Sequence, residues 1–138
     1  MKKLIWIALI IAAVLLLSSG CIKYDYYSYY SEKDNYITVT GTISHMKNSE
    51  ESGLFLAFDN LSVNMADNNF CIKGSSHTAV LANGIMDKLS MGDRVIFVTA
   101  PHYFGDGYTM PIVAIHVDGE WLLTFEEGYA FLLEDLLK

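Results

Sequence analysis

Tyr36-Ile-Thr-Val-Thr-Gly-Thr-Ile-Ser44 is the stretch of sequence that decides the fold class. Its apolar residues Ile37, Val39 and Ile43 alternate with threonines, which is the two-residue period of a strand with one buried face. Gly41 stands on the apolar face, where a glycine allows the sharp bend that a strand of a small barrel needs. The stretch therefore predicts a bent β-strand.

Further strands are expected on both sides of one helix. After a polar loop at residues 46–52, strands are expected at residues 53–59, 70–73, 94–100 and 108–117, and at 121–123 after the Asp118-Gly119 turn. The helix is expected after the third strand, because Gly74-Ser75-Ser76 offers an N-cap. One face of that helix would hold Val80, Leu81, Gly84, Ile85 and Leu89.

A second helix is expected at the C-terminus. Thr124 and Glu127 have the spacing of a capping box. An apolar stripe follows at Phe125, Tyr129, Leu132, Leu133 and Leu136. The stripe would either pack on the rest of the domain or dock into the groove of a partner.

The order of these elements resembles the OB-fold, a small Greek-key barrel with a helix between its third and fourth strands. Leu89-Ser-Met-Gly-Asp-Arg-Val95 is similar to the entry into the fourth strand of many such barrels, and the resemblance covers residues 36–117. It implies a mainly β, five- to six-stranded OB-like Greek-key barrel, to which the C-terminal helix is added.

The first residues resemble a prokaryotic lipoprotein signal. Lys2-Lys3 precede an uninterrupted apolar run at residues 4–17, and Ser18-Ser19-Gly20-Cys21 ends it. The resemblance implies cleavage before Cys21 and a diacylglyceryl group on its sulfur. Ser18 stands where that family most often has leucine, and a retained transmembrane helix is the alternative. Both interpretations place the rest of the chain outside the cytoplasm, at a cell membrane or an outer membrane.

The chain then divides into a signal peptide at residues 1–20, a tyrosine-rich tether at 21–35 and one domain at 36–138. The tether contains Tyr24, Tyr26, Tyr27, Tyr29 and Tyr30. It is interpreted as a spacer of up to about 50 Å. Tyrosines also favour membrane interfaces and stack on ligands, so an interfacial anchor and a ligand platform are alternatives.

Charge and cysteine usage limit the possible partners. The whole chain has a net charge of −7, and removal of Lys2 and Lys3 leaves seven Lys and Arg against sixteen Asp and Glu, or −9. Such a surface repels phosphate backbones, so no nucleic-acid partner is expected. An acylated Cys21 would leave Cys71 alone, and Cys71 is expected to be a buried thiol.

No motif indicates catalysis, a metal or a cofactor. His45, His77, His102 and His116 are scattered, and no HExxH, CxxC or GxSxG motif is present. Asp and Asn are frequent at residues 59–69 without the spacing of a calcium loop. The sequence therefore predicts a protein that is not an enzyme and needs no cofactor.

The resemblance also implies where a ligand would bind. In OB-folds the ligand crosses strands two and three and is held by the loops after strands one and four. Those loops correspond to residues 45–52 and 101–108 here. The candidate ligand-binding residues are His45, His102, Tyr103, Phe104 and Tyr108. The aromatic rings would stack on sugars or peptide side chains, or else fold back to plug the barrel.

The sequence therefore favours an exported, lipid-anchored, non-catalytic module that binds a neutral or cationic glycan or protein segment at the cell envelope. An assembly subunit of an envelope complex, docking through the C-terminal helix, is the alternative. The least favoured hypothesis is a small hydrolase that uses His45, His102 and a nearby carboxylate.

Overall fold

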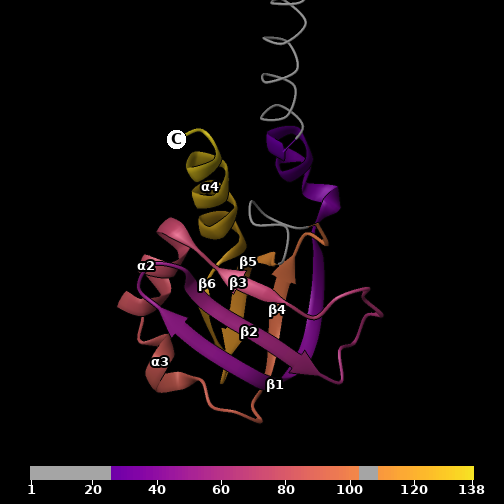
Figure 1. The fold of residues 1–138 in the computed structure, drawn as a ribbon, viewed down its shortest axis with the longest axis vertical. Coiled ribbons are helices and arrows are strands. Elements are labelled where there is room, and N and C mark those ends of the chain that lie inside the picture. Colours follow the sequence, from indigo (N-terminus) through magenta and orange to yellow (C-terminus); the bar gives the residue numbers. More distant parts are fainter. Residues whose placement is uncertain (1–25, 103–108) are drawn as a thin grey trace, which may run out of the picture.

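The structure is a computed structural model that describes residues 26–102 and 109–138, and these residues are mainly β (Figure 1). The strands are β1 (Ile37–Ser49), β2 (Gly53–Asp59), β3 (Phe70–Ile72), β4 (Arg94–Thr99), β5 (Met110–Val117) and β6 (Glu120–Leu123). The helical elements are η1 (Lys33–Asn35), α2 (Gly74–Ala82), α3 (Ile85–Lys88) and α4 (Phe125–Leu136). Residues 26–31 are also helical.

Five of the strands close a barrel. Antiparallel pairs join β1 to β2 and β4, β2 to β3, and β4 to β5, and a parallel pair between β3 and β5 closes the ring. β6 is an extra strand on β5. Helices α2 and α3 connect β3 to β4, and α4 follows β6. The prediction of a mainly β, OB-like barrel with a helix between strands three and four and a C-terminal helix is confirmed.

The long strand β1 bends around the barrel. Its first half pairs with β4, and from Thr42 onward it pairs with β2. A Cβ atom at Gly41 would lie 2.9 Å from the Cβ of Phe58, so only glycine fits where the two strands approach. β1 continues to Ser49, five residues beyond the predicted strand, and His45 therefore lies in a strand and not in a loop.

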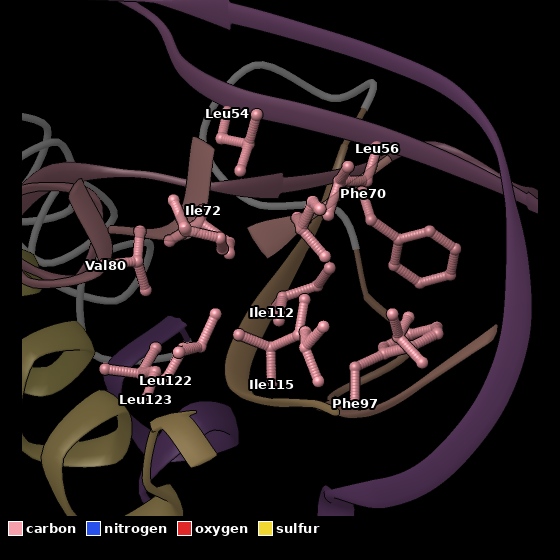
Figure 2. Close-up of a cluster of buried hydrophobic side chains, with 14 of the residues drawn as sticks. Leu54, Leu56, Phe70, Ile72, Val80, Phe97, Ile112, Ile115, Leu122 and Leu123 are labelled. Carbon is pink, nitrogen blue, oxygen red and sulfur yellow. The ribbon is translucent and has the colours of Figure 1, made fainter. Parts of the chain in front are cut away.

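The barrel interior is filled by apolar side chains from every strand of the ring (Figure 2). The rings of Phe58 and Phe97 are stacked with centroids 4.4 Å apart, and the edge of Phe70 packs against both. Val80 of α2 and Leu122 and Leu123 of β6 extend this core. The two helices after β3 therefore cover the barrel.

The structure has two helices where the sequence predicts one. Gly84 has a φ of 77°, which breaks the helix between α2 and α3. Val80, Ile85 and Leu89 are buried as predicted, but the break leaves Leu81 37% exposed. The expected serine N-cap is also absent, because Lys73 is the N-cap residue of α2 and its side chain makes no capping bond.

The C-terminal helix α4 begins as predicted. The hydroxyl of Thr124 accepts a hydrogen bond from the Glu127 backbone N–H and donates one to the Glu127 carboxylate at 3.0 Å. The apolar stripe of α4 packs on the outer face of β4 and β5 in a second core cluster, where Leu132 is 6% exposed. At Gly128 an added Cβ would lie 1.7 Å from the Val113 carbonyl oxygen, so α4 lies directly on β5.

Residues 26–35 are not a tether. The Tyr30 side chain is fully buried in the second core cluster, against residues of β4, β5 and α4. Its hydroxyl donates to the His102 carbonyl at 3.0 Å, and Tyr129 of α4 donates to the Ser31 carbonyl at 2.6 Å. The folded domain thus includes at least residues 26–35, and not only 36–138. Residues 21–25 lie outside the described part of the chain.

Among the described residues, no helix has the length and apolarity that a membrane crossing requires. The apolar run and Cys21 belong to residues 1–25, so the predicted signal and lipid site fall outside the structure that is described.

Candidate functional site

The structure describes two of the five candidate ligand-binding residues. Tyr103, Phe104 and Tyr108 fall in residues 103–108, outside the described ranges. His45 is exposed on β1, and its ring lies 6.2 Å from that of Phe55 on β2. His102 ends the first described range, and its ring lies 4.7 Å from that of Tyr29.

The two histidines are not neighbours. His102 lines a hollow together with Ile37, at the start of β1, whereas His45 pairs with Ala57 eight residues further along the same strand. Eight strand residues span about 26 Å along the backbone. The hydrolase hypothesis requires the two histidines to lie close together, and their places near the start and in the second half of β1 give it no support.

The outer face of the barrel carries one continuous row of side chains across four strands. The strand registers place Lys47 of β1 opposite Phe55 of β2, Phe55 opposite Cys71 of β3, and Cys71 opposite Pro111 of β5. The neighbouring side chains on β2 and β3, such as Leu54 and Ile72, point into the core. This row crosses the strands that the OB resemblance assigns to the ligand.

Two hollows lie along this row. The first has a volume of about 220 Å³ and is lined by Lys47, Ser49, Ser52, Gly53, Phe55, Cys71, Lys73 and Thr109. The second, of about 300 Å³, is lined by Cys71, Lys73, Gly74, Ser76, Pro111, Ile112, Val113, Leu132, Asp135 and Lys138. Because Cys71 and Lys73 line both, the two hollows adjoin each other, and we call them together the β3 groove.

The β3 groove carries positive charge on an acidic protein. Lys47, Lys73 and Lys138 line it, and Asp135 is its one lining carboxylate. Asp135 accepts hydrogen bonds at 3.0 Å from both the backbone N–H and the hydroxyl of Ser75, and Lys138 lies 3.4 Å from it. Asp135 is thus paired with Lys138, and Lys47 and Lys73 are the other two cationic side chains that line the groove.

Cys71 has the environment predicted for it. Its side chain is 5% exposed, and its Sγ lies 3.4 Å from the Ser52 carbonyl oxygen. That contact ties β3 to the turn between β1 and β2. Cys71 also lines both hollows of the β3 groove.

A third hollow lies at the His102 end of the barrel. It has a volume of about 250 Å³ and is lined by Ile37, residues 63–67, Pro101, His102 and Met110. The rings of Tyr26, Tyr29 and Tyr30 surround His102 at centroid distances of 4.7–6.2 Å. His102 therefore packs against the N-terminal helical segment, and part of its ring is not available to a ligand.

Among the described residues, no group of three metal-ligating side chains occurs. His77 is 6% exposed, and its Nε2 lies 2.8 Å from Oδ1 of Asn48. This contact joins α2 to the end of β1, which is a structural role.

Sequence reasoning missed the lysines of the groove. Lys47 was placed in a polar loop and Lys73 at the end of a strand, and neither position is unusual. Their proximity depends on the register of β1 with β2 and of β2 with β3. The sequence of β2 contains no signal for the outer face, because Leu54, Phe55 and Leu56 are all apolar and only the structure shows that Phe55 is the half-buried one.

Comparisons of this chain with protein-family models, with curated proteins and with solved structures found no match.

Proposed function

We propose that this chain is an exported, lipid-anchored binding module without catalytic activity, which holds a protein segment or a glycan of the cell envelope in the β3 groove. The observation that supports the proposal is the row Lys47, Phe55, Cys71 and Pro111, with hollows along it, on the face that OB barrels use for ligands. Anchoring is proposed through a lipid on Cys21.

The charge of the groove refines the expected ligand. The sequence favoured a neutral or cationic ligand because the aromatic loop at residues 101–108 is acidic. The groove is instead lined by lysines together with apolar side chains such as Pro111 and Leu132. We therefore propose a ligand that carries carboxylates or other negative groups beside an apolar surface.

Site-directed photocrosslinking in the native membrane tests the proposal. A photoreactive residue at Lys47 should capture a defined envelope protein or glycan. The same residue at Thr38, which is exposed on the other half of β1, should not. Equal capture from both positions, or capture from neither, would reject the groove as the binding site.

Charge reversal tests the role of the lysines. Lys47→Glu and Lys73→Glu should each lower capture by roughly two- to fivefold, since partly exposed ion pairs contribute about 0.2–1 kcal/mol. Lys88→Glu makes the same change of net charge at a site that pairs with Glu120 and lies outside the groove, so it should leave capture unchanged.

The alternative of an assembly subunit has less support than the binding module. It relied on the apolar stripe of α4, and that stripe packs inside the molecule against β4, β5 and residues 26–36. Leu137, beyond the end of α4, remains 72% exposed. One leucine is not the face of a helix, so the binding module is the better-supported proposal.

A further inference from the structure

A fourth hollow lies away from the β3 groove, where β6 leads into α4. It has a volume of about 220 Å³ and is lined by Trp121, Thr124, Phe125 and Glu126. None of these residues lines the β3 groove.

The aromatic walls of this hollow are held in place before any ligand arrives. The Trp121 ring lies 5.0 Å from that of His116 on the neighbouring strand, in an edge-to-face arrangement. The Phe125 ring lies 5.3 Å from that of Tyr36 and 5.5 Å from that of Tyr129. Ring contacts of this kind restrict the side chains, so a ligand would not have to order them.

Trp121 remains open to solvent despite this packing. Its side chain is 45% exposed, whereas Leu122 and Leu123, which follow it on β6, are 1% exposed. Trp121 therefore faces outward from the barrel and offers a large part of its indole ring to the hollow.

The polar member of the hollow is a carboxylate. Glu126 is exposed in the first turn of α4 and forms no hydrogen bond or ion pair within the described residues. The carboxylates on either side of it in sequence order are already engaged, because Glu127 bonds Thr124 and Glu120 pairs with Lys88 at 3.1 Å. Glu126 is thus the carboxylate that remains available at this site.

An aromatic face beside a free carboxylate attracts organic cations. Trp has the strongest cation–π attraction of the aromatic side chains, and a carboxylate adds direct Coulombic attraction. The net charge of −7 favours the approach of cations to the molecule as a whole. A hollow of this size admits a trimethylammonium group or the end of an arginine or lysine side chain.

We propose that the hollow of Trp121, Phe125 and Glu126 binds an organic cation, with the cation over the indole ring and its charge balanced by Glu126. The ligand proposed is a quaternary ammonium group, such as that of a choline lipid headgroup, because aromatic walls are the usual recognition element for that group. Binding of a basic protein side chain in its place is an outcome that the test distinguishes. The site is independent of the β3 groove and of the ligand proposed there.

Tryptophan fluorescence measures this binding directly. The chain has two tryptophans, Trp6 and Trp121, so the full chain with Trp6→Phe reports on Trp121 alone. At constant ionic strength, choline chloride and N-acetyl-arginine amide are titrated in separate arms. Saturation by choline at the lower concentration supports the proposal, whereas saturation by N-acetyl-arginine amide at the lower concentration would make the hollow a site for a basic protein side chain instead.

A neutral isostere and a matched variant control the titration. The compound 3,3-dimethylbutan-1-ol has the shape of choline without its charge and should give no saturable change. Glu126→Gln should weaken cation binding by about three- to tenfold, in line with the loss of one partly exposed charge pair. Glu134→Gln, an exposed position further along α4, should have no effect.

Several results would overturn the proposal. They are an equal response to the neutral isostere, unchanged affinity in Glu126→Gln, or no saturable response to either cation. A saturable response to methyl glucoside without a response to the cations would instead make the hollow a sugar site. A far-UV circular dichroism spectrum that matches that of the native chain shows that the fold of each variant is intact.

Discussion

At the scale of single residues, Tyr30 does most to join the N-terminal segment to the domain. Its ring is fully buried among apolar residues of β4, β5 and α4. Its hydroxyl donates to the His102 carbonyl, and its own backbone carbonyl accepts the Tyr36 hydroxyl at 2.6 Å. Burial raises the pKa of Tyr30 and of Tyr36 well above the ordinary value of 10.0, and the negative charge of neighbouring ionised tyrosines raises it further.

This burial predicts alkaline destabilisation. Between pH 10 and the raised folded pKa, Tyr30 loses its proton in the unfolded chain and keeps it in the folded one, so the free energy of unfolding decreases as pH rises. The stabilisation is fully present below pH 10, and Tyr30 alone contributes a slope of up to about 1.4 kcal/mol per pH unit above it. Urea unfolding at pH 8, 9, 10 and 11 measures the slope.

Tyr30→Phe should change that slope in a defined way. At pH 8 the variant should be less stable by about 1 kcal/mol, the contribution of one hydrogen bond. Between pH 10 and 11 it should lose less stability than the native chain, because one titrating group is gone. Tyr27→Phe, at a position outside both core clusters, is the control. An identical alkaline slope in Tyr30→Phe and the native chain would contradict the burial argument.

At the scale of the elements, α2 depends on α4 for its cap. The first backbone N–H groups of a helix need acceptors from outside it, and the Asp135 carboxylate supplies one to Ser75. Gly74 allows this approach, because an added Cβ there would lie 2.3 Å from Oδ2 of Asp135. A carboxylate at this end also interacts favourably with the helix dipole.

Removing this cap should destabilise the domain measurably. Asp135→Ala is expected to lower the free energy of unfolding by about 1–2 kcal/mol, the usual cost of losing an N-cap acceptor. Asp135→Asn keeps an oxygen acceptor and should cost less. Glu134→Ala, exposed on the same helix, should stay within about 0.5 kcal/mol of the native chain. Chemical denaturation of the three variants measures these free energies of unfolding. Equal losses of stability in Asp135→Ala and Glu134→Ala would refute the capping role.

The sequence indicates elements that have a local pattern, and it does not indicate features that depend on residues far away in the chain. The alternation in the first half of β1, the apolar run of β2 and the capping box of α4 are local patterns, and each predicted element was found. The end of β1 was missed because residues 45–49 have no apolar alternation of their own. They are strand because β2, which is strongly apolar, pairs with them. The cap of α2 was missed because its acceptor is 60 residues away in sequence.

At the scale of the whole molecule, the packing of residues 26–35 was the largest departure from prediction. Tyrosines among Ser and Asp have neither the helical nor the strand period, so composition favoured a tether. The burial of Tyr30 depends on Val98, Ala114 and Leu132, which are 68 or more residues away. The β3 groove was likewise predicted only in part. The resemblance to the OB-fold indicated the strands that the ligand would cross, but not the lysines that line them.

The packed segment brings the domain close to the proposed anchor. Four residues separate Cys21 from Tyr26, and five Cα steps reach at most about 18 Å, whereas a fourteen-residue spacer would reach about 50 Å. The α3–β4 connection lies at the end of the molecule opposite the helix at residues 26–31 (Figure 1). A probe in that connection therefore reports the height of the domain above the membrane.

Energy transfer from Met91→Cys to a dye in the lipid headgroups measures this height for the full chain in vesicles. Met91 is 56% exposed, so it accepts a label, whereas Cys71 is buried. The native linker should give a narrow distance distribution. Ten Gly and Ser residues inserted between residues 25 and 26 should broaden it and increase the mean, since such an insert has a root-mean-square length of about 17 Å. A native distribution as broad as that of the insertion variant would mean that residues 26–35 do not hold the domain near the bilayer.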